Sequence, residues 1–127
     1  MRKTYVVLAL ASVISLMTPA WAGAGDMSVA TFLEKAERLQ KKGPLALLSK
    51  DLKLLQAEMK GTAQSYRAKV VADKKAGLVP HSCPPAEARM NSDELLAHLR
   101  SYPVQARSKT TISTAFADLM KKRYPCK

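Results

Sequence analysis

The chain has 127 residues, which is enough for one domain with a modest hydrophobic core and excludes a large multi-domain assembly on one chain. It carries 21 Lys and Arg against 10 Asp and Glu, a formal net charge of +11. This balance favours acidic partners, whether an anionic protein surface, lipid head groups or nucleic acid, over cationic ones.

The first residues have the order of a secretory signal peptide. A short basic start, Arg2-Lys3, precedes an apolar run over residues 5–17. Ala20-Trp21-Ala22 forms an A-x-A cleavage site before Gly23, and a second candidate site follows Ala24. An uncleaved membrane anchor is the alternative, but the apolar run is short for a span of about 20 residues. We therefore expect residues 1–22 to be removed.

The mature product is expected to be one domain, residues 23–127, in the periplasm or outside the cell and without a transmembrane segment. Nineteen Lys and Arg remain after cleavage against all ten acids, a net charge of +9. The basic residues are spread over the whole chain, and only five aromatic residues are left for base stacking. Nucleic acid is therefore the weakest of the candidate partners.

Residues 29–39 carry apolar side chains at steps of three and four, which predicts an amphipathic helix. Asp26 or Ser28 is its expected N-cap. Gly43 ends the helix, and Pro44 suits the first turn of the next element.

A long amphipathic helix is predicted from the same spacing between Leu45 and about residue 76. Ser49 looks like an N-cap, so the first turn is expected to be a separate short helix before the long one begins at Lys50. Gly61 lies mid-pattern and is a candidate kink. We expect residues 45–59 to face the core of the same molecule, with a dimer or partner surface as the alternative. Beyond Gly61 both options stay open.

The stretch 78–90 is a loop by composition and holds Cys83. Asn91 or Ser92 is expected to cap the next helix, which Tyr102-Pro103 stops.

The last helix follows a predicted linker over residues 104–110 and begins after Thr110 or Thr111. Asp118 is expected to pair with Lys122 on its outer side. The fold class expected from the whole pattern is all-α, a small domain of about four to five helices with one long amphipathic helix.

Cys83 and Cys126 are the only cysteines, and export would expose them to oxidising conditions in which they pair. Together with His81 and His98 they could instead supply four metal ligands. His81-x-Cys83 is not a usual structural zinc spacing, however, and a disulfide uses both sulfurs. We therefore predict a structural disulfide, no metal and no cofactor.

No catalytic residue is predicted. Asp93 and Glu94 are adjacent on a helix and point in different directions, so they do not form an acid-base pair, and acids in a first helical turn are favoured by the helix dipole. The sequence contains no Gly-rich phosphate loop, GxSxG elbow, HExxH or CxxC motif. His98 lies at the edge of an apolar face, where a half-buried packing role is expected. A non-enzymatic binding protein is the expected class.

Three segments, residues 81–85 (HSCPP), 94–103 (ELLAHLRSYP) and 115–126 (AFADLMKKRYPC), together resemble the C-terminal half of the Rap/Tai immunity-protein domain family. In that family a Cys-Pro turn, a helix ending in Pro and a closing helix ending in aromatic-Pro-Cys recur in this order. Cys83 and Cys126 match its structural disulfide. The second cysteine pair of the immunity-type members has no counterpart in this chain.

The resemblance implies an all-helical periplasmic protein, often a homodimer, that neutralises a peptidoglycan amidase toxin delivered by type VI secretion. The expected contact surface is the long helix with its adjacent loops, and no individual partner-binding residue can be assigned. Two other functions are carried as alternatives: a periplasmic stress or chaperone-like protein, and a cationic binder of envelope polyanions.

Overall fold

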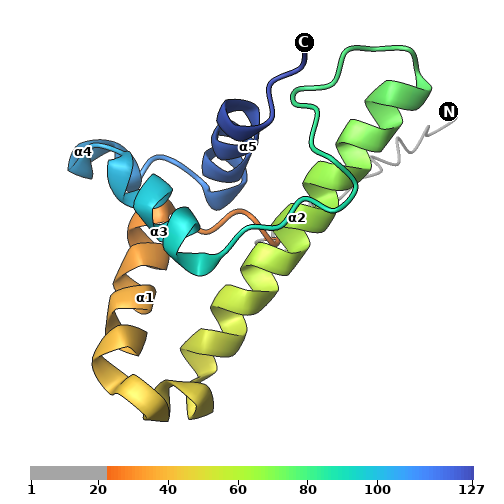
Figure 1. Ribbon diagram of the computed structural model, residues 1–127. Coiled ribbons are helices and arrows are strands. Elements are labelled where there is room, and N and C mark those ends of the chain that lie inside the picture. Colours follow the sequence, from red (N-terminus) through yellow and green to blue (C-terminus); the bar gives the residue numbers. More distant parts are fainter. Residues whose placement is uncertain (1–22) are drawn as a thin grey trace, which may run out of the picture.

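Figure 1 shows a computed structural model, which describes residues 23–127. The elements in chain order are α1 (Val29–Lys42), the 3₁₀ helix η1 (Gly43–Leu48), α2 (Lys50–Lys75), α3 (Ser92–Ser101), α4 (Val104–Arg107) and α5 (Ile112–Arg123). Over this part of the chain there is no β-strand, only an isolated antiparallel bridge between Ser28 and Thr111. The predicted all-α class with one long helix is confirmed, while the predicted signal peptide lies outside the described residues.

Each long helix begins at a side chain that accepts a backbone N–H bond. Ser28 Oγ accepts from Thr31, Ser49 Oγ from Asp51, Asn91 Oδ1 from Glu94, and Thr111 Oγ1 from Thr114. These caps satisfy amide groups that have no partner inside the helix. Two candidate N-caps were predicted for each of α1, α3 and α5, and the residues that cap these helices are Ser28, Asn91 and Thr111. Gly43 and Gly77 adopt positive φ values of 56° and 72° just after α1 and α2, a conformation that glycine reaches without strain.

The segment predicted as a linker over residues 104–110 contains one helical turn, α4. Pro103 precedes this turn with φ −55°, which suits the start of a helix. Arg107 bonds back to α3: its Nε donates to the carbonyl of Tyr102 (2.9 Å) and its Nη2 to that of Arg100 (2.8 Å). Arg107 thus satisfies carbonyl groups at the end of α3, an interaction that helical periodicity does not predict.

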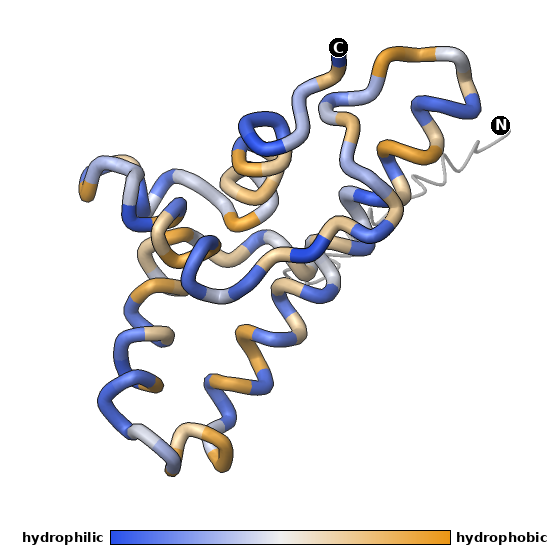
Figure 2. Tube along the Cα trace, in the orientation of Figure 1, coloured by the Kyte–Doolittle hydropathy of each residue, from blue (hydrophilic) through white to orange (hydrophobic). Residues whose placement is uncertain are grey.

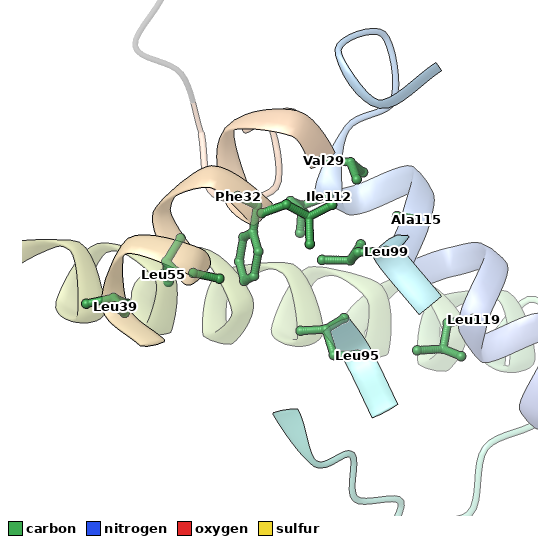
Figure 3. Close-up of a cluster of buried hydrophobic side chains, with 11 residues drawn as sticks. Val29, Phe32, Leu39, Leu55, Leu95, Leu99, Ile112, Ala115 and Leu119 are labelled. Atoms are coloured by element: carbon green, nitrogen blue, oxygen red, sulfur yellow. The ribbon is translucent and has the colours of Figure 1, made fainter. Parts of the chain in front are cut away.

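The helices α1 and α2 form a hairpin, joined at η1, that opens away from the connection (Figure 1). Helices α3 and α5 lie over its open end, and the core fills the space between the four helices. Figure 3 shows Phe32 of α1 and Leu99 of α3 close to Ile112 of α5. Leu99 and Ile112 are fully buried, and full burial of such a side chain stabilises the fold by about 1.5–3 kcal/mol.

The burial of the long amphipathic segment agrees with the expectation only in part. Leu55 is buried, and Leu52 and Met59 are partly buried against the core, as expected for residues 45–59. Leu45 and Leu48, expected in the core, are 68% and 84% exposed, because η1 lies at the turn of the hairpin beyond the reach of α3 and α5. Beyond Gly61, where a partner surface was an equal alternative, Thr62 and Val70 are buried. Helix α2 runs unbroken through Gly61, the position of the candidate kink.

The predicted disulfide between Cys83 and Cys126 is confirmed, with 5.0 Å between the two Cα atoms. The connection from α2 to α3 turns back beside α2, on the side of the C-terminal segment, before it reaches α3 (Figure 1). The Cys83 N–H donates to the carbonyl of Tyr124 at 2.8 Å, so one backbone bond runs beside the sulfur bridge. The disulfide therefore ties this returning loop to the segment that follows α5.

Candidate functional site

The turn of the hairpin exposes a cluster of leucines. Leu45, Leu47 and Leu48 are 68%, 75% and 84% exposed and belong to a single stretch of η1, which we call the leucine elbow. Leu54, in the second turn of α2, is 46% exposed. Figure 2 shows this apolar segment at the lower end of the molecule, where α1 and α2 meet. Single exposed leucines are ordinary, but three within four residues make this tip unusually apolar, which makes it a candidate interaction site.

Four exposed lysines surround the leucine elbow in the sequence. Lys41 and Lys42 end α1, and Lys50 and Lys53 lie in the first turns of α2. None of the four forms an ion pair with an acidic side chain in the part of the chain that the structure describes. The candidate site thus combines an apolar centre with a positively charged rim.

A charge cluster fixes the two helices on either side of the elbow. Asp51 Oδ1 accepts a bond from Lys35 Nζ at 2.8 Å, and its Oδ2 lies 3.6 Å from Arg38 Nη2. Arg38 also contacts Glu34 at 2.6 Å. The hydrogen bond from Lys35, followed by the charges of Lys35 and Arg38, lowers the pKa of Asp51 below its ordinary value. The two contacts of Asp51 cross from α2 to α1 close to the elbow and hold together the ends of the helices that flank it.

The exposure of the elbow was missed because the apolar spacing of residues 45–59 matches a buried helical face. One signal was available in the sequence. Leu45, Leu47 and Leu48 lie within four residues directly after Gly43-Pro44, and neighbouring residues on a tight helix point in different directions. Three leucines in such a turn cannot all face one core.

A shallow groove of about 440 Å³ lies between α3 and α5. Its lining consists of Glu94, Ala97, His98, Ser101, Leu119, Lys122 and Arg123. Its polar side chains other than Lys122 bond to one another or to the backbone: Arg123 Nη1 donates to Glu94 at 2.7 Å, and Ser101 Oγ donates to the carbonyl of His98. His98 is half-buried, as expected, with Nε2 2.9 Å from the Ala115 carbonyl oxygen. These bonds do not pair a nucleophile with an adjacent base.

Asp118, predicted to pair with Lys122, instead accepts a hydrogen bond from the hydroxyl of Tyr102 at 2.5 Å. Burial of the Tyr102 ring and this bond to Asp118 raise the pKa of the Tyr102 hydroxyl above its ordinary value of 10.0. Tyr102 follows α3 and Asp118 lies on α5, so the bond joins the two helices. Its role is to fix the orientation of α5.

Cys83 and His81 lie on the returning loop, where His81 contacts α2. The hydroxyl of Tyr66 lies 2.9 Å from His81 Nδ1 and 2.5 Å from the fully buried Ser82 Oγ. The Tyr66 ring also meets Phe116 of α5 edge-on, with 5.5 Å between ring centroids. Tyr66 therefore anchors the loop beside the disulfide, and His98 belongs to the separate contact with α5.

Among residues 23–127 no group of three or more His, Cys, Asp or Glu side chains is arranged to hold a metal ion. Helices long and apolar enough to cross a membrane are also absent from this part of the chain. No family model matches the chain, and neither a curated protein nor a solved structure matches it.

Proposed function

We propose that this chain is an exported, non-enzymatic protein-binding domain whose partner docks on the leucine elbow. The observation that carries the proposal is the exposure of Leu45, Leu47 and Leu48, between 68% and 84%, at the tip of a hairpin whose two arms Asp51 joins beside the tip. Fixing an apolar tip before binding lowers the entropy lost on association. Burying three leucines would supply the apolar centre that protein interfaces have.

The chemistry of the elbow selects a partner with an apolar pocket and an acidic rim. Lys41, Lys42, Lys50 and Lys53 surround the leucines in the sequence and are free of acidic partners within residues 23–127. Complementary charges at such a rim speed association and select among partners. The resemblance to the Rap/Tai family suggests a peptidoglycan amidase toxin as this partner, and the chain would then act as its inhibitor.

Calorimetric titration of the oxidised protein against type VI peptidoglycan amidases tests the proposal. The double variant Leu47→Ser/Leu48→Ser should bind at least about 30-fold more weakly, which corresponds to a loss of about 2 kcal/mol at a central apolar contact. Its thermal stability should be unchanged, because both side chains are exposed.

The matched control is Val79→Ser/Val104→Ser, which removes two valines that are 84% and 72% exposed but lie far from the elbow in the sequence. This control should bind like the wild type. Equal loss of affinity in the two double variants would sink the elbow as the docking site, and no binding to any amidase would remove the assignment of the partner.

A lysine-rimmed leucine tip also suits an anionic membrane surface, which is the second candidate and follows from the same charges. Co-sedimentation with phosphatidylglycerol vesicles separates the two. Vesicle binding that needs Leu47 and Leu48 and disappears at about 0.5 M salt would favour the membrane over a protein partner.

A further inference from the structure

The residues just before α1, numbers 23–28, form a segment that we call the N-terminal hook. It is bonded to the start of α5: the Ile112 N–H donates to the Met27 carbonyl at 2.8 Å, and the Ser113 N–H to the Gly25 carbonyl at 3.0 Å. The Val29 N–H returns a bond to the Thr110 carbonyl at 2.8 Å. The hook is therefore part of the folded domain.

The carboxylate of Glu58 holds the hook from the other side. Glu58 lies on α2 and is only 7% exposed. Its Oε1 accepts two backbone bonds, from Gly25 N (2.6 Å) and from Met27 N (3.1 Å). A buried carboxylate is costly unless it is hydrogen-bonded, and these backbone donors meet that need.

Ala24 fits against a glycine of α2. A Cβ atom added to Gly61 would collide with the Cβ of Ala24. Glycine in a helix interior is unfavourable relative to alanine, so its presence at position 61 is explained by the space that Ala24 occupies. Cleavage after Ala24 would remove this contact, so the packing favours a processing site that keeps Ala24 in the mature protein.

Asp26 faces the N-terminal end of the hook. Its Oδ2 accepts a bond from the Gly23 N–H at 2.9 Å, and its own N–H donates to the Gly23 carbonyl at 3.2 Å. The group that Asp26 contacts is thus the nitrogen that cleavage before Gly23 would release.

We propose that the Ala22–Gly23 peptide bond is the processing site and that the α-ammonium group of Gly23 becomes an ion-pair partner of Asp26. A signal peptidase would hydrolyse the bond with one water molecule, leaving a carboxylate on Ala22 and an ammonium group on Gly23. The neutral N–H bond to Asp26 thereby becomes a charge-assisted one, which is stronger. Processing then both releases the domain and completes the bonding of the hook.

The first experiment is N-terminal sequencing and intact-mass measurement of the exported protein. We expect a single mature form that begins with Gly23. A form that begins with Gly25, or one that keeps residues 1–22, would overturn the proposal.

The second experiment tests the ion pair with Asp26→Asn, which keeps an acceptor oxygen but removes the charge. In the chain that starts at Gly23, this change should lower the melting temperature by about 2 °C, as for an exposed ion pair. In a chain that starts at Ala20, where the Gly23 nitrogen stays an uncharged amide, the same change should have no effect. Equal shifts in the two chains, or no shift in either, would refute the pairing; Glu87→Gln, an exposed loop acid, is the control for total charge.

Discussion

Asp51 joins the two arms of the hairpin through one carboxylate that contacts two basic side chains of α1. Lys35 Nζ lies 2.8 Å from its Oδ1, and Arg38 Nη2 lies 3.6 Å from its Oδ2. The side chain is also in the first turn of α2, where a negative charge is favoured by the helix dipole. A single residue thus stabilises both the start of α2 and its contact with α1.

The pH dependence of stability should carry the signature of Asp51. Because its folded pKa lies below the ordinary 3.8, its contribution is fully present above that value and is lost as the pH falls through the lower folded pKa. In urea denaturation between about pH 6 and about pH 2, the stability difference between the wild type and Asp51→Asn should shrink once the pH drops below about 3.8. A difference that stays constant down to pH 2 would contradict the assignment, and Glu87→Gln again serves as the control.

The burial of Glu58 is a feature that could not be predicted from the sequence. It lies in α2 between Ala57 and Met59, and the sequence pattern there does not predict that a charged residue is buried. Its burial depends on Gly25 and Met27, backbone groups more than 30 residues earlier in the chain. Periodicity reports contacts within an element and carries no record of such a distant partner, whereas Ser28 and Asn91 were predictable as caps because their partners lie three residues away.

At the scale of the element, α2 contains a glycine that serves a contact and leaves the helix unbroken. Gly61 faces Ala24, and the helix continues for 14 residues beyond it to Lys75. The sequence indicates only a candidate kink at this position. It does not indicate the contact, because Ala24 belongs to another part of the chain.

Gly61→Ala should therefore destabilise the protein, although the same change stabilises an exposed helix by about 1 kcal/mol. We expect a loss of about 1–3 kcal/mol in the free energy of unfolding from urea denaturation, the usual range for inserting a methyl group into a packed site. Ala24→Gly combined with Gly61→Ala should recover most of this loss, since the colliding methyl group is gone. A stabilised single variant would show that Ala24 does not pack there.

The elbow and the far half of α2 show why an element can be predicted while its surroundings cannot. The apolar spacing indicated the helix correctly over both regions. Leu48 and Val70 satisfy the same pattern, yet one is 84% exposed and the other 5%. Which of the two is covered depends on where α5 and the returning loop pack, and this follows from the connections between helices.

At the scale of the whole molecule, the disulfide links the loop after α2 to the segment after α5. Cys83 and Cys126 are 43 residues apart, and cross-linking such a loop stabilises the fold by about 4 kcal/mol on the chain-entropy estimate. This feature was predictable because it rests on a count of two cysteines and an inferred compartment. It does not depend on packing.

Cys126→Ser should lower the melting temperature by at least about 10 °C in thermal denaturation, given that about 1 kcal/mol corresponds to about 4–8 °C in a domain of this size. The total helicity measured by circular dichroism at low temperature should be largely retained, because α1 and α2 contact each other without the loop. Wild-type protein treated with reductant should reproduce the shift. No shift in either sample would mean that the bridge adds nothing to stability.

The bridge between Ser28 and Thr111 also determines when folding can finish. A chain that emerges from a ribosome or a translocation channel with its N-terminus first presents the hook at once, but Ile112 and Ser113, which bond to it, arrive only near the end. Until then the carbonyl groups of Met27 and Gly25, which accept bonds from Ile112 and Ser113 in the folded domain, are open to water. The hairpin of α1 and α2 can form early from contacts close in sequence, and closure of the domain waits for its last few residues. Vectorial emergence thus makes the two ends of the chain the final contacts to form.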